Sequence, residues 1–363
     1  MNILSGSVGL SKYNGVVSPV YYIYHIRNLK DSIRYFSYIF QCSEFQKNLR
    51  RLGKGILIRE TEDGRLNTIR TKVPSYQLSI EKIPYPNENT QRSIAKFLDK
   101  KIGEIDSLIE NEYHQIEKLI EYKQSAITEF VTKGLDKNTF FKESGVEWIK
   151  KIPTSWQVLP LKTLFYTGKG LPITKDNLVE KGIKVISYGQ IHAKYNNPVS
   201  IDERLYRFVL EDWLNTNNDC LVNKSDFIFA DTSEDIEGSG DFVYIDNDET
   251  IFAGYHCVVL KAKKKENYKY LAYLFMSQLW KNQIQCKVKG VKLFTISQSI
   301  LQSTSVILPT IEEQIKIANK LDIISSAISK IINIKNSKIE QLEEYKKSLI
   351  YEYVTGKKEV IAW

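Results

Sequence analysis

The chain contains one long stretch twice. The first copy covers residues 86–132 and the second covers residues 309–355, and the two copies align from end to end without a gap. A gapless internal repeat of this length implies two similar structural units. Identical pairs include Gln91/Gln314, Ile94/Ile317, Ala95/Ala318, Leu98/Leu321, Asp99/Asp322 and Glu-Tyr-Lys at 121–123 and 344–346.

Both copies have the pattern of a coiled-coil helix. Apolar residues recur at every seventh position in two rows, which Lys123 and Lys346 interrupt at equivalent places. About 40 helical residues would span roughly 60 Å. The copies could pair with each other or with another molecule, and their equal length and phase favour pairing within the chain. The residues expected to pair the helices are Ile102, Ile105, Ile109, Ile116, Leu119, Phe130, Ile328, Ile332, Ile339, Leu342, Leu349 and Tyr353.

Length and composition limit the possible classes of protein. A chain of 363 residues that is 42% hydrophobic suggests two or three domains. The sequence has no apolar run of membrane-spanning length and no signal-peptide pattern at residues 1–10, so we expect a cytoplasmic protein without a membrane partner. The net charge of +8 permits nucleic acid as a partner. The four cysteines lack a C-x-x-C pair and predict reduced thiols rather than a metal site.

The repeated helices alternate with globular α/β pieces. Strands are expected at 16–17, 20–24 and 55–58 and a helix at 33–52, and later strands at 184–188, 226–230, 250–252 and 256–260 and a helix at 268–284. Part of this globular pattern also repeats, with a slightly larger offset than the helices, as in Tyr35/Tyr270 and Tyr38/Tyr273. The order is therefore globular, helix, globular, helix. The front of the second globular piece, up to Asp235, has no counterpart in the first.

The order of these pieces, with the motifs at their joints, resembles the specificity (S) subunit of Type I restriction-modification enzymes. Pro309-x-x-x-Glu313-Gln314, followed by Ile317-Ala318 and Leu321-Asp322, is similar to that family's helix opening, and residues 86–99 form a weaker version. Residues 145–149 with Ile152-Pro153-x-x-Trp156 look like the entry into a target recognition domain. Residues 186–192 and 230–235 look like later parts of that domain, and residues 6–19 like the second half of another.

The resemblance implies an α+β fold with two α/β target recognition domains, the first partial, separated by two long helices that form an antiparallel coiled coil. The expected parts are the partial first recognition domain at 1–86, the first helix and connector at 87–145, the second recognition domain at 146–308 and the second helix at 309–363. It also implies a DNA-reading subunit that binds a split double-stranded target and docks methyltransferase (M) subunits, with the restriction (R) subunit joining through them. S-adenosylmethionine, ATP and Mg²⁺ would belong to those partners, and this chain would hold no cofactor.

The sequence contains no catalytic constellation or phosphate-binding loop that would support a self-contained enzyme. The acidic loop at 231–241 is better interpreted as a surface loop than as a metal site. The expected role is therefore DNA recognition without catalysis. The alternatives are a half-specificity subunit that works as a homodimer or with a complementary half, a coiled-coil scaffold, and a stand-alone DNA-modifying enzyme.

Candidate DNA contacts are cationic, amide and aromatic side chains beside predicted strands or glycine loops. Gln can pair with adenine, Lys can reach guanine or phosphate, and Tyr can contact sugar or base. For each, an ordinary solvated surface is an equally good interpretation. The candidates are Lys169, Thr174, Lys175, Tyr188, Gln190, His192, Lys194, Tyr195, Lys287, Lys289 and Lys292, with Arg50, Arg51 and Lys54 in the first piece.

Overall fold

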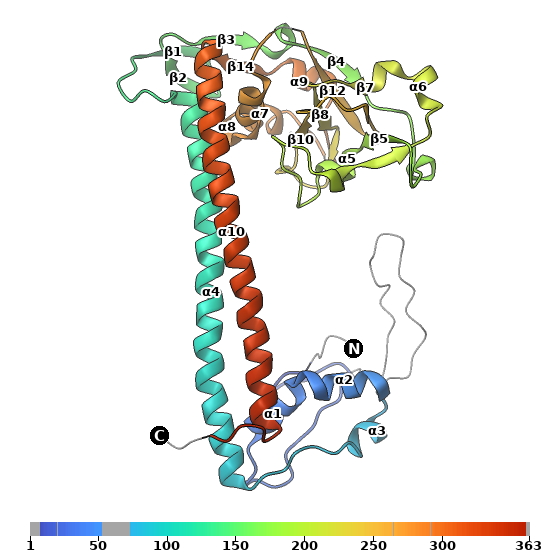
Figure 1. Cartoon of the computed structure of the whole chain (residues 1–363), viewed down its shortest axis with the longest axis vertical. Coiled ribbons are helices and arrows are strands. Elements are labelled where there is room, and N and C mark those ends of the chain that lie inside the picture. The colour runs from blue at the N-terminus through green and yellow to red at the C-terminus, as the bar shows by residue number, and fades with distance from the viewer. Residues whose placement is uncertain (1–7, 20, 53–72, 264, 291, 361–363) are drawn as a thin grey trace. The chain divides into compact units, whose positions relative to one another are not determined.

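A computed structural model describes residues 8–19, 21–52, 73–263, 265–290 and 292–360. The chain forms two compact units (Figure 1). Unit 1 contains residues 1–117 and 331–363, and unit 2 contains residues 118–330. The two long helices, α4 (Glu88–Lys133) and α10 (Ile311–Val354), each contribute to both units.

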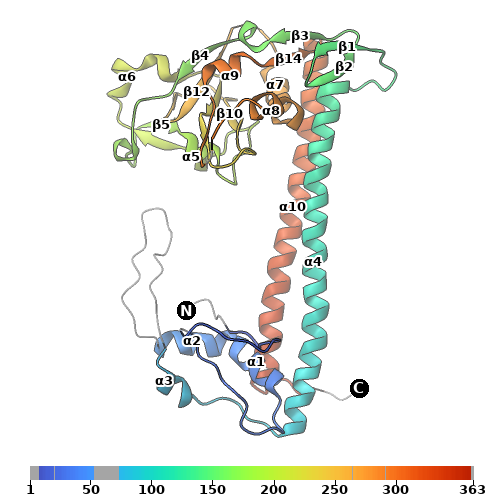
Figure 2. The ribbon, with the colours of Figure 1, turned by 180° about the vertical axis from the view of Figure 1, so that it is seen from behind.

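The repeated stretch is helical over nearly its whole length, as its pattern predicts. Within unit 1 the first part of α4 and the last part of α10 run antiparallel, since Asp106 bonds Lys346 while Glu112 bonds Lys335. Within unit 2 the other ends of these helices share one hydrophobic core, with Ile127 and Val131 beside Ile317 and Leu321. In each unit the two helices lie side by side in both ribbon views (Figures 1 and 2).

The centre of the helix pair carries charge instead of apolar side chains. Glu112 is only 4% exposed, and its carboxylate oxygens accept from Lys335 at 2.9 Å and Lys338 at 2.6 Å. Hydrogen bonds from Lys338 and Lys335 lower the pKa of Glu112. Glu112 and Lys335 occupy the same position in the two copies of the repeat. The two copies of the repeat therefore meet in unit 1 through equivalent positions that carry opposite charges.

The interrupting lysines have different surroundings in the two units. In unit 1, Lys346 donates to Asp106 at 2.6 Å. In unit 2, burial lowers the pKa of Lys123, and Ser329 occupies the position that corresponds to Asp106. The interrupting lysines of the two copies therefore differ in their surroundings.

The globular elements beside each helix start are also duplicated. In unit 1, α1 (Ile33–Gln41) and α2 (Ser43–Leu52) meet at Cys42, and in unit 2, α7 (Tyr268–Met276) and α8 (Gln278–Gln285) meet at Ser277. The single helices expected at 33–52 and 268–284 are thus each two helices. Ser32 and Asn267 cap α1 and α7 equivalently, since each side chain accepts from the backbone N–H three residues later.

Buried polar contacts repeat with the elements. Gln91 donates to the Pro86 carbonyl and accepts from the Ser32 N–H, and Gln314 makes the same contacts with Pro309 and Asn267. These glutamines fix each helix start against the chain that leads into α1 or α7.

Two tyrosines, one in each unit, join the short helices to the long ones. Tyr38 and Tyr273 donate to Asp99 and Asp322, at 2.5 and 2.7 Å. Each aspartate also pairs with a cation, Arg34 or Lys269. These identities, which the repeat showed in sequence, are therefore explained by matching contacts.

Unit 2 contains the strands of the described chain. They are β1 (Phe141–Val146), β2 (Ile149–Pro153), β3 (Gln157–Pro160), β4 (Phe165–Lys169), β5 (Ile183–Ile186), β6 (Arg207–Val209), β7 (Leu221–Val222), β8 (Phe227–Ala230), β9 (Thr232–Ser233), β10 (Phe242–Tyr244), β11 (Ile251–Ala253), β12 (Cys257–Ala262), β13 (Phe294–Thr295) and β14 (Ser305–Leu308). Helices α5 (Tyr188–Ile191), α6 (Trp213–Thr216) and α9 (Gln298–Gln302) lie between them, and α3 (Ser75–Ser79) belongs to unit 1.

These strands form two four-stranded sheets and three small pairs. One sheet has the order β10-β8-β12-β4 and is antiparallel, and the other has the order β6-β5-β11-β7, with β5 and β11 parallel. The pairs are β1-β2, β13-β9 and β14-β3. Strands expected at 184–188, 226–230, 250–252 and 256–260 correspond to β5, β8, β11 and β12.

Aromatic side chains fill the core between the first sheet and α7–α8. Phe227, Phe229 and Phe242 from the sheet surround Phe275, whose ring lies 4.2 Å from that of Trp280. All are at most 1% exposed. Full burial of a phenylalanine side chain stabilises a fold by roughly 1.5–3 kcal/mol, so this cluster holds the sheet against the helices.

The strands expected near the start of the chain are not formed. Val16 and Val17 and residues 21–24 are described but unassigned to any strand, and Tyr21, Ile23 and Tyr24 are about half exposed. A strand requires a neighbour for its backbone groups, and no described residue pairs with this segment. The strand expected at 55–58 lies outside the described residues. Across the described chain, no helix is long and apolar enough to cross a membrane.

Candidate nucleic-acid interface

The ends of several strands meet at one edge of unit 2. Parallel strands β5 and β11 end together, with Ala253 opposite Ile186, while β8 ends with Ala230 opposite Cys257 and β4 ends with Lys169 opposite Val258. The residues that follow these strands therefore lie close together. We call Lys169, Tyr188, Asp231, Tyr255 and His256 the strand-end edge.

Two glycines bring the loops of this edge into direct contact. A Cβ atom added to Gly170 would lie 1.7 Å from the Gly254 carbonyl oxygen, and one added to Gly254 would lie 2.0 Å from the Ser187 Oγ. Only glycine allows backbones to approach this closely. The segments that carry Lys169, Tyr188 and Tyr255 are consequently held in fixed positions.

An aromatic and imidazole cluster occupies the edge. The Tyr188 ring lies 5.6 Å from the Tyr255 ring and 5.3 Å from the His256 imidazole, and the His256 Nδ1 is 3.2 Å from the Asp231 Oδ1. His256 has a φ of 53°, in the left-handed region that non-glycine residues rarely adopt. Its side chain is 58% exposed. This cluster can stack on a base or hydrogen-bond to a base edge.

The sequence pattern singled out Tyr188 but missed Tyr255 and His256. They lie in the short turn between two buried strands, β11 and β12. The available signal was the polar aromatic pair Tyr-His directly after Gly254 in an otherwise apolar run.

Two residues predicted to contact DNA, Gln190 and His192, already form hydrogen bonds within unit 2. The Gln190 side-chain oxygen accepts from the Ser187 N–H in a capping box, and the His192 ring nitrogens lie 3.2 Å from Asp241 Oδ2 and 2.9 Å from the Thr232 carbonyl oxygen. These bonds anchor α5 and the acidic loop. Asp241 also pairs with Lys281 on α8. Among the described residues no group of three or more acidic, histidine or cysteine side chains is placed to hold a metal.

The titration of His192 gives a prediction about stability. The hydrogen bond to Asp241 and the Thr232 carbonyl raise the pKa of His192 above its usual 6.5. A group whose pKa is raised by folding stabilises the fold fully below its unfolded pKa and loses that contribution as pH rises through the folded pKa. Thermal unfolding of wild type and His192→Gln from pH 5 to 9 should show the largest wild-type advantage at the acidic end. An advantage that grows with pH would contradict this role.

The remaining candidates in unit 2 have exposed side chains. Lys194 is exposed, and Tyr195 donates to the Arg204 carbonyl while the Arg204 guanidinium lies 4.6 Å from its ring centre. Lys287 donates to Ser303 at 2.8 Å, and Lys289 and Lys292 are exposed in the loop before β13. Thr174 and Lys175 are exposed at a short capped turn in the segment that follows Lys169.

In unit 1 the candidates are described only in part. Arg51 is exposed at the end of α2, nothing is described of the Arg50 side chain, and Lys54 lies outside the described residues. The residues expected to pair the helices are all buried or partly buried in the long helices.

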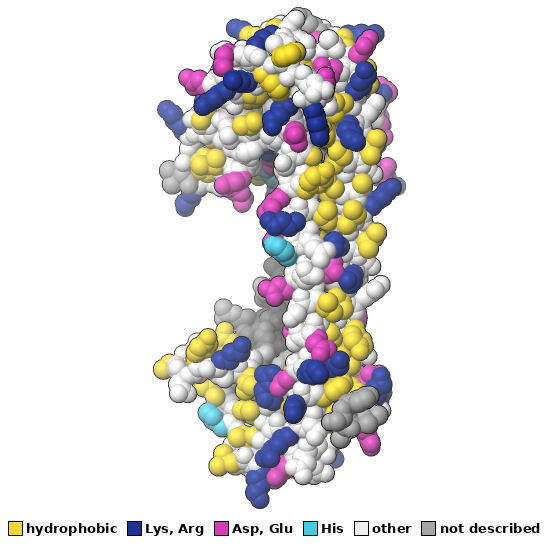
Figure 3. All heavy atoms as spheres, turned by 90° about the vertical axis from the view of Figure 1, so that its left-hand side faces the viewer, with side chains coloured by type: hydrophobic (Ala, Val, Ile, Leu, Met, Phe, Trp, Pro, Cys, Tyr) yellow, Lys and Arg dark blue, Asp and Glu magenta, His cyan; other side chains and the backbone are white. Residues whose placement is uncertain are grey.

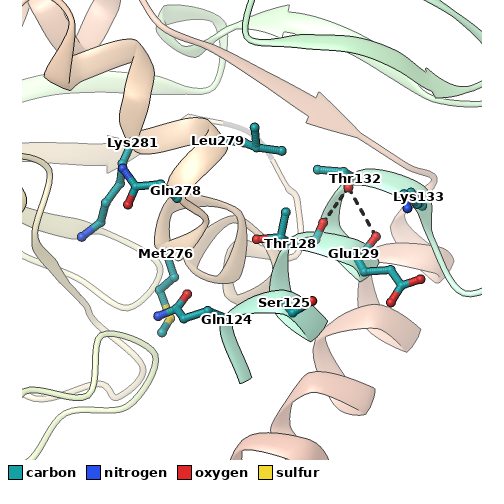
Figure 4. A pocket seen from close by; sticks show the side chains of 10 residues that line it. All are labelled: Gln124, Ser125, Thr128, Glu129, Thr132, Lys133, Met276, Gln278, Leu279 and Lys281. Carbon is teal, nitrogen blue, oxygen red and sulfur yellow. Dashed lines mark hydrogen bonds between the residues drawn. The ribbon is translucent and has the colours of Figure 1, made fainter. Parts of the chain in front are cut away.

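Unit 2 also has an open groove of about 690 Å³ along the last turns of α4 (Figure 4). Gln124, Thr128 and Thr132 line one wall and Met276, Leu279 and Lys281 the other. Thr132 donates to the carbonyls of Thr128 and Glu129, so its hydroxyl is already used by the helix. The lining combines polar and apolar side chains.

Comparison with known proteins identifies relatives of this architecture. Residues 153–344, just over half of the chain, match the family model of the type I restriction modification DNA specificity domain. The chain is 28% identical over 279 residues to the type I restriction enzyme MjaVIII specificity subunit of Methanocaldococcus jannaschii. It is 27% identical over 296 residues to the putative type I restriction enzyme MjaX specificity subunit of the same organism.

These matches cover 76% and 79% of this chain, which spans 62% of the length of each of these relatives. A chain from a solved structure on the assembly of a type I R-M system matches with a TM-score of 0.63 at 12% identity, covering 89% of this chain and 71% of that one.

Proposed function

Because the chain belongs to the type I restriction modification DNA specificity domain family, we propose that it reads DNA sequence as the specificity subunit of such a system. The observation that carries the proposal is the strand-end edge of unit 2, where three segments hold Lys169, Tyr188, Tyr255 and His256 together on a family-matched domain. Lysine supplies phosphate affinity, and tyrosine and histidine supply base contacts.

We further propose that the DNA target is split and that each unit contributes one reader. The duplicated contacts of Gln91 and Gln314 and of Tyr38 and Tyr273 support two related units, each beside one start of a long helix. The helix pair would then serve as the spacer between half-sites, as paired half-sites generally require a fixed separation.

Partner subunits would dock on the helices. Exposed apolar side chains lie along them in each unit, among them Leu108, Ile331 and Ile334 in unit 1 and Ile120 and Ile323 in unit 2. Figure 3 shows apolar side chains gathered over the long helices on the face it displays. Clustered exposed apolar surface marks protein interfaces. We assign it to methyltransferase subunits, through which the restriction subunit would join. S-adenosylmethionine, ATP and Mg²⁺ would belong to these partner subunits, and this chain would be non-catalytic.

Lysine contacts with phosphate should make DNA binding depend strongly on salt. Each phosphate contact contributes about 0.9 to the slope of log affinity against log salt concentration. Replacing Lys169 and Lys175 together with alanine should lower that slope by up to about 1.8, with weaker binding to every DNA sequence. Fluorescence anisotropy with duplex DNA between low and moderate salt, on the chain assembled with its methyltransferase subunit, measures both.

The matched control is Lys150→Ala with Lys151→Ala, two exposed lysines at the β1-β2 hairpin. It should leave the slope unchanged. A wild-type affinity that does not vary with salt, or an equal effect of both double variants, would contradict the proposed interface.

A further inference from the structure

In unit 2 the Trp156 side chain fills a buried position between the long helices and α7, which we call the tryptophan seat. Trp156 is fully buried, its ring lies 6.5 Å from that of Tyr270, and its indole N–H donates to the Glu313 carboxylate at 3.1 Å. The Tyr270 hydroxyl donates to the carbonyls of Val131 at the end of α4 and Ile307 in β14. Directly after Trp156, β3 pairs antiparallel with β14.

Unit 1 repeats the tyrosine hydrogen bonds that lie beside this seat. The Tyr35 hydroxyl donates to the carbonyls of Val354 and Pro84. Val354 matches Val131 in the repeat, and Pro84 matches Ile307 when the same alignment is extended to the residues just before the repeat. At the corresponding place in unit 1 there is a cavity of about 630 Å³, which no tryptophan among the described residues fills. Its lining includes Tyr35, Pro84, Tyr85, Thr90, Ser93 and Val354.

The chain beside this cavity is exposed where its counterpart is covered. Leu308 is 6% exposed in unit 2, whereas Tyr85, at the matching position of the extended alignment, is 63% exposed. Val306 and Ile307 are fully buried, whereas Ile83 is partly buried and Pro84 exposed. Among the described residues of unit 1, no strand pairs with residues 82–85. The described residues of unit 1 therefore repeat the tyrosine hydrogen bonds but contain no strand that corresponds to β3.

Pro84 does not prevent a strand from pairing here. In unit 2 the Thr304 carbonyl accepts a hydrogen bond from the Leu161 N–H. In an antiparallel pair every second residue bonds to the neighbouring strand, so the backbone groups of Val306 and Leu308 in β14 face β3. Ile307 is directed the other way, and its carbonyl accepts from Tyr270. Pro84 corresponds to Ile307, so the N–H that proline lacks is one that the ladder does not use.

We propose that this cavity of unit 1 is a docking site for a tryptophan-anchored strand supplied by another polypeptide. The tryptophan would insert beside Tyr35, with the Thr90 hydroxyl at the position of Glu313 as an acceptor for the indole N–H, and the following residues would pair antiparallel with residues 82–85. The occupant has the chemistry of residues 149–160, Ile-Lys-Lys-Ile-Pro-Thr-Ser-Trp-Gln-Val-Leu-Pro. Added-strand recognition of this kind combines backbone bonds with side-chain pockets. The inference rests on the proposed function only for the purpose of the site, which would be to complete the first DNA reader.

The test uses the full chain and a labelled synthetic peptide with the sequence of residues 149–160, in the absence of DNA. We expect saturable binding by fluorescence anisotropy, weakened at least about tenfold when the peptide tryptophan is replaced by alanine, because a buried aromatic anchor carries most of such an interaction. Ser93→Trp in the protein places a bulky side chain at the cavity lining and should weaken binding by a similar factor.

Ser107→Trp is the matched control, since Ser107 is an exposed serine of the same helix outside the cavity lining. It should bind the peptide as wild type does. The proposal would be overturned if the peptide did not bind, or if it bound equally well without its tryptophan. Equal binding to the Ser93→Trp and Ser107→Trp variants would also overturn it. The last result would also indicate that the peptide invades the unit 2 seat. Because no DNA is present, failure here is distinct from failure of DNA recognition.

Discussion

Replacing Trp156 with alanine is expected to destabilise unit 2 by about 3–5 kcal/mol, the usual cost of removing a buried large aromatic side chain. Trp156 is fully buried between Tyr270 and the end of α4, where a Cβ atom added to Gly134 would lie 3.3 Å from the indole ring. Its loss also leaves Glu313 without the indole donor. Chemical denaturation followed by circular dichroism measures the change in the free energy of unfolding.

Two variants separate the causes of this effect. Trp156→Phe keeps an aromatic ring but loses the indole donor, and it should cost less than the alanine variant. Trp213→Ala removes a partly buried tryptophan of the same unit and should cost the least. A Trp156→Ala loss no larger than that of Trp213→Ala would contradict the view that the entry segment holds the recognition domain against the helices.

Reversing the charge of Glu112 should destabilise the helix pair more than reversing any exposed charge on the same helix. Glu112→Lys would place three cations together at a site where the present carboxylate is 4% exposed and bonded by both Lys335 and Lys338. Removing one partner of a buried pair leaves an uncompensated charge. Glu110→Lys, at an exposed position of α4, is the control and should change the unfolding temperature little.

The charge swap tests the pair itself. Combining Glu112→Lys with Lys335→Glu and Lys338→Glu should recover most of the lost unfolding temperature, because the ion pair is restored in reverse. Since Glu112 and Lys335 are equivalent in the repeat, two first copies that paired in this register would oppose two glutamates. Polar residues in a seam can select partners in this way. No recovery in the triple variant would contradict this account of the helix pairing.

The repeat determined how much of this fold could be predicted. Its heptad rows identify α4 and α10 closely, and the shared Gln91/Gln314 and Asp99/Asp322 identities correspond to contacts that both units make. The breaks at Cys42 and Ser277 could not be predicted, because residues on both sides favour helix and the interruption depends on packing against the long helices. Strand propensity at 20–24 was misleading for a related reason: pairing requires a neighbour, which no local pattern reports.

The site was harder to predict than the fold. Gln190 and His192 have the side chains of DNA contacts, but tertiary structure uses them to cap α5 and to bind Asp241. Conversely, Tyr255 and His256 join Tyr188 only because β5 and β11 end side by side. Sequence supplies the chemistry of such residues, whereas strand order decides which of them meet.

If the chain is the specificity subunit proposed here, it determines which DNA sequence its complex modifies. The most direct measurement is single-molecule methylome sequencing of cells that express the chain together with its methyltransferase subunit, compared with cells that express the methyltransferase subunit alone. We expect adenine methylation at one split motif that appears only when the chain is present. Methylation that is absent, spread without a motif, or identical without the chain would contradict it.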